Sequence, residues 1–272
     1  MSFSPKINEE HAASAFNKQS EIFDEEYASN TIIHYKRTRV RQHVLKYLMP
    51  GSNILELNAG TGDDAIYFAS MGNFVHATDI STGMQEKLRQ KVREHNLTDR
   101  VSNEACSYTA LDCLQKKGPY ELIFSNFAGL NCTNELEKVF NSFEKLLKPG
   151  GLVTLVILPK FCLWEFLLLF KGKFRTATRR VFSLQGRDAQ IDGSAFTCWY
   201  HSPKTVQRIL KNFTLLELEG LCTIVPPSYI ENFAEMHPKT FSFLRQKEDQ
   251  YKNKWPWKYV GDYYIITFRK KF

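Results

Sequence analysis

The chain alternates short apolar runs with stretches whose apolar residues recur at helical spacing. Residues 6–49 contain no glycine and place apolar side chains at roughly helical intervals, which predicts helices that end at Met49-Pro50-Gly51. From residue 53 onward, strand-like runs alternate with helical segments. Because strands that alternate with helices need crossover connections, this order predicts an α/β fold with a parallel sheet covered by helices on both faces.

The expected strands are short apolar runs bounded by turn residues. They cover residues 53–57, 74–78, 101–105, 120–125, 152–158, 213–218 and 262–268. The helices expected between them cover residues 63–70, 83–96, 135–147 and 203–212. The run at 152–158 is continuously apolar, which indicates a strand buried on both faces.

Two segments interrupt this alternation. Residues 161–170 are bulky and apolar, and the basic stretch 171–180 and a polar loop through Gly193 follow them. A membrane-spanning helix needs about 20 apolar residues, so the first segment is interpreted as a lid or an interfacial helix. An aromatic-rich insertion occupies residues 221–260. The expected organisation is an N-terminal helical lid (1–50) and one main domain (51–272), with substrate-side insertions at 159–202 and 221–260.

Composition indicates a globular protein. The 272 residues are 43% hydrophobic and 24% charged, and the formal charge of +7 is a modest excess that suits nucleic acid, an anionic surface or a solvated basic face. The six cysteines form no Cys-x-x-Cys pair and have no histidines at zinc-finger spacing, so we expect reduced thiols and no metal. Acidic residues stand where a signal peptide would need an apolar run, which favours a cytoplasmic location.

A glycine-rich loop follows the first expected strand. Glu56-Leu57-Asn58-Ala59-Gly60-Thr61-Gly62 places small residues where backbone can approach a ligand closely, although many such loops are only tight turns. The next strand ends at Asp79, close to the spacing of about 20 residues at which nucleotide-binding folds place an acid for ribose hydroxyls. This spacing suits either NAD or S-adenosylmethionine, and it also suits an acid that only caps a turn.

The details of the loop resemble class I S-adenosylmethionine-dependent methyltransferases. Their first motif reads hydrophobic-acidic-hydrophobic-Gly-x-Gly-x-Gly, and this chain matches it except that Asn58 replaces the first glycine, a change that asparagine's tolerance of left-handed angles allows. Leu147-Lys148-Pro149-Gly150-Gly151 matches the turn before the fifth strand of the same family. The resemblance extends from about Ser52 to Phe213. It implies a Rossmann-like, seven-stranded, mostly parallel sheet whose last strand is antiparallel.

The resemblance also implies a cofactor site. Glu56 would lie near the amino-acid end of S-adenosylmethionine, Asp79 would hold the ribose hydroxyls, and Ile80 would cover one adenine face. The family usually carries an aspartate where this chain has Ser107, so a hydroxyl and backbone groups would recognise adenine here. The full set of expected cofactor contacts is Tyr35, Arg37, Glu56, Asn58, Ala59, Gly60, Gly62, Asp79, Ile80, Cys106, Ser107 and Asn126, with S-adenosylhomocysteine as product.

The N-terminal segment resembles the leading helices of quinone-biosynthesis methyltransferases. The residues that carry this likeness are Ala15-Phe16-Asn17-Lys18, Tyr27 and His34-Tyr35-Lys36-Arg37. In that group the leading helices close over the cofactor. Tyr35 and Arg37 are therefore expected to reach its carboxylate, with a surface role for Arg37 as the alternative.

Several residues are candidates for the acceptor side. Asn126 follows the fourth strand, where it either contacts substrate or cofactor or only satisfies loop backbone. His201 is a candidate base, with an ordinary loop residue as the alternative. Arg179 and Arg180 form a basic pair that could bind a carboxylate or phosphate, unless it is simply exposed. Tyr200 and Tyr229 complete the expected acceptor site.

These residues predict methyl transfer to a small-molecule acceptor of amphipathic or anionic character. A nicotinamide dehydrogenase is disfavoured because the loop lacks Gly-x-Gly-x-x-Gly. An RNA-modifying methyltransferase is disfavoured because no Asn-Pro-Pro-Tyr or Asp-Pro-Pro-Tyr segment follows the fourth strand and no RNA-binding module is visible. A non-catalytic relative that keeps only the cofactor pocket stays open, since Asn58 and Ser107 depart from the family pattern.

Overall fold

The computed structural model describes residues 5–21, 24, 30–183, 185–191, 193–230 and 232–271. Two helices open the chain, as expected: α1 (Pro5–Gln19) and α3 (Thr31–Leu45). Asn30 starts α3, because its side chain accepts hydrogen bonds from the backbone N–H groups of Ile32 and Ile33. Tyr27 lies outside the described residues.

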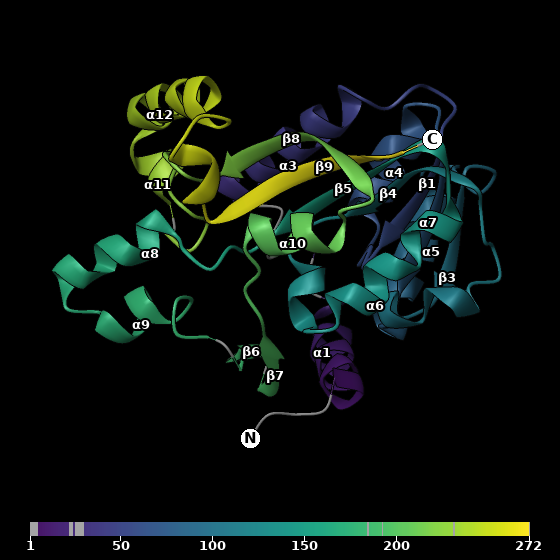
Figure 1. Ribbon diagram of the computed structural model, residues 1–272, viewed down its shortest axis with the longest axis horizontal. Helices are drawn as coiled ribbons and strands as arrows, with labels where there is room; N and C mark the ends of the chain where they lie inside the picture. Colours follow the sequence, from purple (N-terminus) through teal and green to yellow (C-terminus); the bar gives the residue numbers. More distant parts are fainter. Residues whose placement is uncertain are drawn as a thin grey trace.

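The centre of the fold is a seven-stranded sheet in the order β3-β2-β1-β4-β5-β9-β8 (Figure 1). Its strands are β1 (Asn53–Leu57), β2 (Phe74–Asp79), β3 (Val101–Ala105), β4 (Tyr120–Ser125), β5 (Leu147–Ile157), β8 (Phe213–Leu221) and β9 (Tyr263–Lys270). β1 to β5 pair in parallel, whereas β9 runs antiparallel to both β5 and β8. The predicted Rossmann-like sheet with an antiparallel last strand is therefore confirmed.

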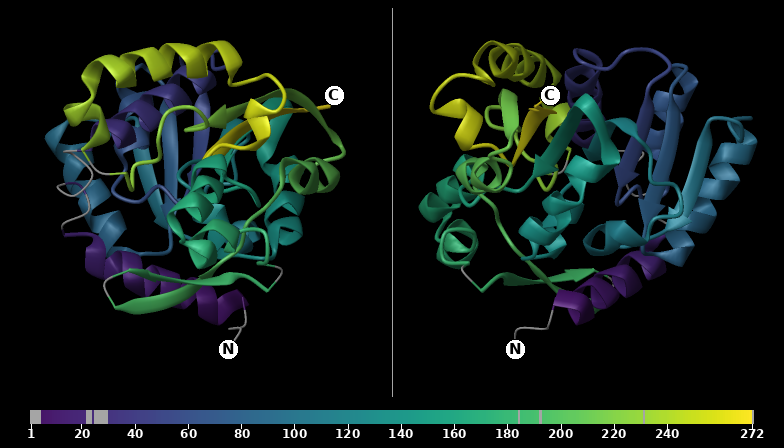
Figure 2. Two further views of the ribbon diagram at one scale, coloured as in Figure 1. Left: turned by 90° about the vertical axis from the view of Figure 1, so that its left-hand side faces the viewer. Right: turned by 45° about the vertical axis from the view of Figure 1, so that its right-hand side comes forward.

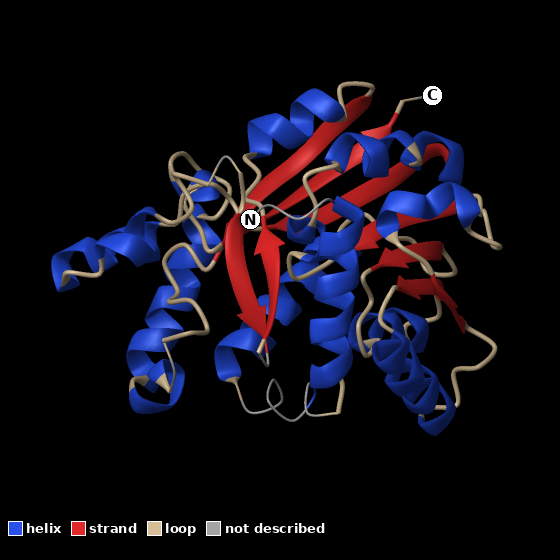
Figure 3. Ribbon diagram, turned by 90° about the horizontal axis from the view of Figure 1, so that it is seen from below, coloured by secondary structure: helices blue, strands red, loops and turns tan. Residues whose placement is uncertain are grey.

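Helices cover both faces of this sheet (Figure 3). The helical elements of the core are α4 (Asp63–Ser70), α5 (Thr82–Glu94), η1 (Tyr108–Cys113), η2 (Gly129–Cys132), α6 (Leu136–Asn141), α7 (Phe143–Leu146) and α10 (Pro203–Ile209). Successive side chains of β1 point to opposite faces of the sheet and so belong to two hydrophobic cores. Leu55 packs with residues of α6, α7 and α10, and Ile54 packs with residues of α3, α4 and α5. Burial on both faces explains the continuous apolar run of β5.

Several boundaries shift by one to three residues, and two differences are larger. The single helix predicted over 135–147 is divided at Ser142, which ends α6 and precedes α7. β5 begins at Leu147 rather than 152, because Leu147 pairs with Tyr120 before a register shift in the ladder with β4. The Pro-Gly-Gly turn is thus part of an irregular strand start.

The first insertion contains regular structure throughout most of its length. It forms α8 (Leu163–Leu167), η3 (Leu168–Lys171), α9 (Phe174–Thr178) and a hairpin of β6 (Arg187–Ile191) and β7 (Ser194–Cys198). The expectation of a polar loop through Gly193 was wrong for β6. Asp192-Gly193 between two short alternating runs is a hairpin signal that could have identified it. The second insertion forms α11 (Phe233–Met236), α12 (Pro238–Tyr251) and η4 (Trp257–Tyr259).

Helix α1 lies beside the β6–β7 hairpin in both views of Figure 2. Asn8 fixes this contact: its Nδ2 donates to the carbonyl oxygens of Cys132 (2.7 Å) and Thr197 (3.0 Å), and its Oδ1 accepts from Thr197 N (2.6 Å). At the other end, Asn17 Oδ1 accepts from Gly83 N (2.5 Å) in α5. The helix therefore bridges the insertion and the sheet domain. No helix in the described part of the chain is long and apolar enough to cross a membrane.

Candidate functional site

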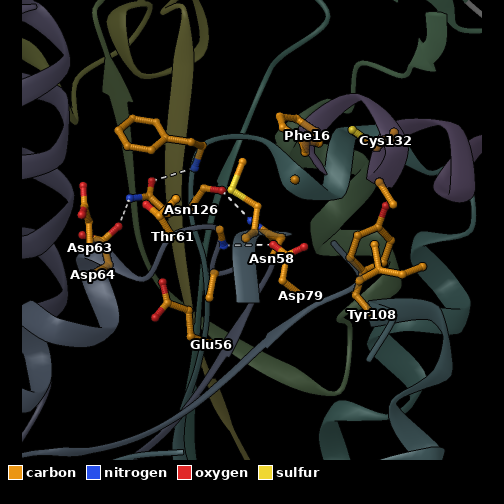
Figure 4. Close-up of a pocket in the computed structure, with 18 of the residues that line it drawn as sticks. Phe16, Glu56, Asn58, Thr61, Asp63, Asp64, Asp79, Tyr108, Asn126 and Cys132 are labelled. Atoms are coloured by element: carbon orange, nitrogen blue, oxygen red, sulfur yellow. Dashed lines mark hydrogen bonds between the residues drawn. The ribbon is translucent and has the colours of Figure 1, made fainter. Parts of the chain in front are cut away.

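A cavity opens at the carboxyl ends of β1, β2 and β4, with α1 against it (Figure 4). The expected cofactor residues that line it are Arg37, Glu56, Asn58, Ala59, Gly60, Asp79, Ile80 and Asn126. Sequence reasoning missed other lining residues, among them Glu9, Phe16, Asp63, Asp64, Tyr108 and Cys132. Phe16 belongs to the α1 segment that carried the family likeness, whereas Glu9 carried no local motif, because only packing brings that helix to the cavity.

The glycine-rich loop adopts left-handed backbone angles, which asparagine and glycine tolerate. Asn58 has φ +47° and Gly60 has φ +56°, both in the left-handed region. A Cβ atom at Gly60 would meet nothing within 4 Å, so this backbone faces open space in the cavity. The Asn58 amide ties the loop to β4, donating to Asn126 O (2.9 Å) and accepting from Ser125 Oγ (2.6 Å). Its bulk is accommodated by Gly129, where a Cβ would lie 2.2 Å from Asn58 Cγ.

The Asp79 carboxylate is held at the end of β2 by backbone donors. Its Oδ2 accepts from Gly60 N (2.9 Å) and its Oδ1 accepts from Ser81 N (2.8 Å). Burial raises the pKa of Asp79, and these backbone hydrogen bonds partly oppose that rise. Each carboxylate oxygen keeps accepting capacity for a ligand hydroxyl. This geometry suits a ribose.

One side of the cavity is rich in carboxylates. Glu56 is buried and its Oε2 has no partner among the described residues, and burial together with Asp64 raises the pKa of Glu56 well above its usual range. Asp64 accepts from Asn126 Nδ2 (2.7 Å), and Arg37 pairs with Asp63. An ammonium group bound here would relieve the uncompensated buried oxygen. The donor set therefore fits the amino-acid end of S-adenosylmethionine.

Both polar atoms of the Asn126 side-chain amide form hydrogen bonds within the protein. Besides its bond to Asp64, its Oδ1 accepts from Phe127 N (2.8 Å). The next two residues, Phe127 and Ala128, have φ +44° and +63°, an unusual conformation for non-glycine residues that Asn126 helps to hold. Asn126 therefore satisfies loop backbone, as one of its two expected interpretations has it, and it also lines the cavity.

The opposite side of the cavity carries an acid from α1. Glu9 accepts hydrogen bonds from Ser107 Oγ and from Thr109 Oγ1 (3.1 Å), while its Oε1 is buried without a partner among the described residues. Burial raises the pKa of Glu9. Ser107 itself does not line the cavity, nor does Cys106, whose thiol faces the carbonyl oxygens of Ser107 and Ala110. The expected direct contacts of Cys106 and Ser107 are thereby corrected.

Two further expected cofactor contacts are also corrected. Tyr35 donates its hydroxyl to Glu248 (3.0 Å) and packs on Phe241, away from the cavity. It is two residues from Arg37 on α3, and residues at that spacing do not face the same way. Gly62 does not line the cavity either, because it starts α4 with φ +84° and packs directly against Leu88.

A second cavity adjoins the first. Phe16, Phe127 and Cys132 line both. Its further lining residues come mainly from the first insertion and include Arg175, Arg179, Arg187, Asp188, Tyr200 and Tyr263. Burial raises the pKa of Tyr200 to about 12, so its phenol stays protonated at neutral pH. Arg179 and Tyr200, both expected on the acceptor side, line this cavity, and Arg179 also binds Glu165 through Nε (2.9 Å) and Nη2 (2.5 Å).

Three acceptor-side expectations are corrected. Arg180 is buried, and its guanidinium binds Glu165 and Asp262, which makes it a structural residue. His201 is buried with Nε2 3.1 Å from Thr133 O, and burial lowers its pKa to about 4. Neither these residues nor Tyr229 line either cavity. His201 therefore has no access to an acceptor.

Comparison with known proteins identifies the domain. Residues 54–151 match the family model described as a methyltransferase domain. The polyketide synthase component of lovastatin nonaketide synthase from Aspergillus terreus is 34% identical over 137 residues, 46% of this chain but 4% of that protein. The demethylmenaquinone methyltransferase of Lactococcus lactis is 28% identical over 157 residues, 56% of this chain and 60% of that protein. The chain thus spans less than two thirds of either relative.

The fold comparison covers nearly the whole chain. The 1,6-didemethyltoxoflavin-N1-methyltransferase of Burkholderia thailandensis, solved with 1,6-didemethyltoxoflavin and S-adenosylhomocysteine, superposes with a TM-score of 0.59 at 14% identity. The match covers 99% of this chain and 92% of that one, so the likeness in fold extends well beyond residues 54–151. Residues 54–151 therefore match a methyltransferase domain, and the chain has the Rossmann-like fold found in S-adenosylmethionine-dependent methyltransferases.

Proposed function

We propose that this protein transfers the sulfonium methyl group of S-adenosylmethionine to a small-molecule acceptor held in the second cavity. The observation that carries the proposal is the junction of the two cavities at Phe16, Phe127 and Cys132. A cofactor in the first cavity would present its methyl group there, next to the acceptor. The cofactor supplies an already activated methyl group, so the chain's own contribution is binding and orientation.

Three carboxylates would bind the polar groups of the cofactor. Asp79 would accept hydrogen bonds from the ribose hydroxyls, and Glu56 would face the α-ammonium group. Glu9 would accept from the exocyclic amino group of adenine, because its free Oε1 is buried at the other side of the cavity. The Ser107 hydroxyl would orient Glu9, so the acid that the family usually carries at this position comes here from α1.

The N-terminal segment 1–50 would act as the lid over this site. Glu9, Phe16 and Arg37 all line the first cavity, and Phe16 packs on Phe196 of the hairpin with ring centroids 6.0 Å apart. Such a lid would exclude water from the methyl group while the acceptor is in place. Exchange of cofactor for product would require α1 to move.

The acceptor is proposed to be amphipathic and anionic. Arg175, Arg179 and Arg187 line the second cavity, against Asp188 as the one carboxylate among the described lining residues. Aromatic rings of Phe127 and Tyr263 form part of its apolar wall. No histidine lines it within the described ranges, so orientation rather than a dedicated imidazole base would promote transfer. The six free cysteines support a reducing, cytoplasmic location.

Titration calorimetry tests the cofactor assignment. S-adenosylhomocysteine and S-adenosylmethionine should bind with micromolar affinity and NAD should not. Asp79→Ala should weaken the binding of S-adenosylhomocysteine by about 1.5 to 3 kcal/mol for each hydrogen bond that the carboxylate no longer accepts. Asp99→Ala, at an exposed acid away from the cavity, is the matched control. Tighter binding of NAD, or equal affinity in the two variants, would overturn the assignment.

A further inference from the structure

The arm formed by residues 160–182 exposes an unusual amount of apolar surface. This arm contains α8, η3 and α9 and projects from the sheet domain (Figure 1). Its exposed large apolar residues are Phe166, Leu167, Phe170, Phe174, Val181 and Phe182. Three of them are largely in solvent: Phe170 is 83% exposed, Phe174 66% and Phe182 70%. Single exposed apolar residues are ordinary, but a concentration of this kind marks an interaction surface.

Basic residues lie between these apolar side chains. Lys171, Lys173 and Arg175 are exposed, and no hydrogen bond or ion pair to another described residue is found for them. The one acidic residue of the arm, Glu165, is buried and bound by Arg179 and Arg180. The exposed surface of the arm is therefore apolar and cationic, with no acidic group of its own to offset the charge.

We propose that this arm docks onto the surface of an anionic lipid bilayer. Phe170 and Phe174 would enter the interfacial region while Lys171 and Lys173 contact lipid phosphates, the arrangement by which interfacial segments combine apolar insertion with charge. The helices of the arm have five, four and five residues, too short to cross the hydrocarbon core. The positive charge of the exposed lysines complements anionic lipid headgroups, and the exposed phenylalanines suit the interfacial region of a bilayer, which favours a lipid surface as the partner.

The arm is also part of the second cavity, because Arg175, Thr176 and Arg179 line it. Docking would bring that cavity close to the bilayer. If the proposed function holds, an amphipathic acceptor would then enter from the membrane. The docking itself needs neither cofactor nor turnover, so it can be measured independently.

Vesicle co-sedimentation tests the docking. The full chain should sediment with phosphatidylcholine vesicles that contain phosphatidylglycerol, should bind pure phosphatidylcholine much more weakly, and should be released by salt. The paired variant Phe170→Ser/Phe174→Ser and the paired variant Lys171→Gln/Lys173→Gln should each bind about tenfold more weakly. Phe243→Ser, at a 55% exposed phenylalanine on α12, is the matched control and should bind as the unmodified chain does.

Two readouts keep the outcome interpretable. Thermal unfolding should be nearly unchanged in all variants, since the replaced side chains are exposed. The inference would be overturned if the unmodified chain did not bind anionic vesicles. It would also be overturned if Phe243→Ser reduced vesicle binding as much as the two paired variants do. A concentration-dependent dimer that Phe170→Ser/Phe174→Ser abolishes, without vesicle binding, would assign the surface to self-association instead. Loss of S-adenosylhomocysteine binding would contradict the proposed function and leave the docking result standing.

Discussion

The Ser107 hydroxyl donates a hydrogen bond to the Glu9 carboxylate, which lies 98 residues earlier in the chain. Ser107 follows β3, at the position where the family usually places an aspartate, whereas Glu9 belongs to α1. A carboxylate therefore lies beside Ser107 in space, although the motif itself carries none. In the proposed function this arrangement links adenine recognition to the N-terminal lid, because α1 must be in place for the carboxylate to reach the cavity.

Removing the Glu9 carboxylate should weaken adenine recognition. We expect Glu9→Ala to reduce S-adenosylhomocysteine affinity by about 1.5 to 3 kcal/mol, the range for hydrogen bonds to charged groups. The variant should also lose its preference for S-adenosylhomocysteine over S-inosylhomocysteine, which has an oxygen in place of the adenine amino group. Calorimetry with both ligands measures this difference.

A rescue separates recognition from simple damage to α1. Ser107→Asp in the Glu9→Ala background returns an acid to its usual position in the family and should restore most of the affinity. The same Ser107→Asp change with Glu9 present should instead weaken binding, because two carboxylates would then face each other. Wild-type affinity in Glu9→Ala would remove this residue from the site.

Two glycines of the loop should respond differently to alanine. Both have positive φ, so each substitution carries a backbone cost of about 1 to 2 kcal/mol. At Gly60 the new methyl group would project into open cavity space, and ligand affinity should fall beyond this cost. At Gly62 it would lie 2.6 Å from Leu88 Cγ, so the free energy of unfolding should fall further, by about 1 to 3 kcal/mol. Denaturation and calorimetry on both variants give the comparison.

Arg180 should matter for stability rather than for the acceptor. Its loss leaves Glu165 and Asp262 buried with less compensation, so Arg180→Gln should lower the free energy of unfolding by about 3 to 5 kcal/mol. Arg175→Gln, at an exposed arginine, should stay within about 0.5 kcal/mol. Chemical denaturation measures both values. An Arg180→Gln protein of unchanged stability would show that this cluster contributes little to folding.

The pH dependence of stability should include a contribution from His201. Burial lowers its pKa from 6.5 to about 4 in the folded chain. Below pH 6.5 the unfolded chain takes up this proton first, so stability is lost as pH falls towards 4, by about 3 kcal/mol in total. Above pH 6.5 the group is neutral in both states and adds no pH dependence.

Replacing the imidazole tests both this contribution and the absence of a catalytic role. His201→Gln should make the acid limb of a stability–pH curve shallower. The pH profile of methyl transfer per folded molecule should not change, because the side chain lines neither cavity. A profile that loses an ionisation near neutral pH in the variant would return His201 to the reaction.

Local pattern was enough to locate several strands, one helix and the glycine-rich loop. The bounds predicted for β1, β3, β4 and α4 agree with the structure, because each is a short apolar or periodic run between turn residues. The glycine-rich loop and Asp79 could likewise be located by their place at strand ends. Short strands, helices and turns depend mainly on residues that are adjacent in the sequence, so the sequence alone can predict them.

Tertiary structure alone decided which other polar residues face the cavities. Arg37 reaches the first cavity, whereas Tyr35 binds Glu248. Arg179 lines the second cavity, whereas Arg180 is buried in an ion-pair cluster. Each pair lies close together in sequence, yet its members differ in the element packed against them. Glu9 reaches the site through the packing of α1 on the hairpin and on α5. A side chain's burial and partners depend on contacts between distant segments, and those contacts form only when the whole chain packs.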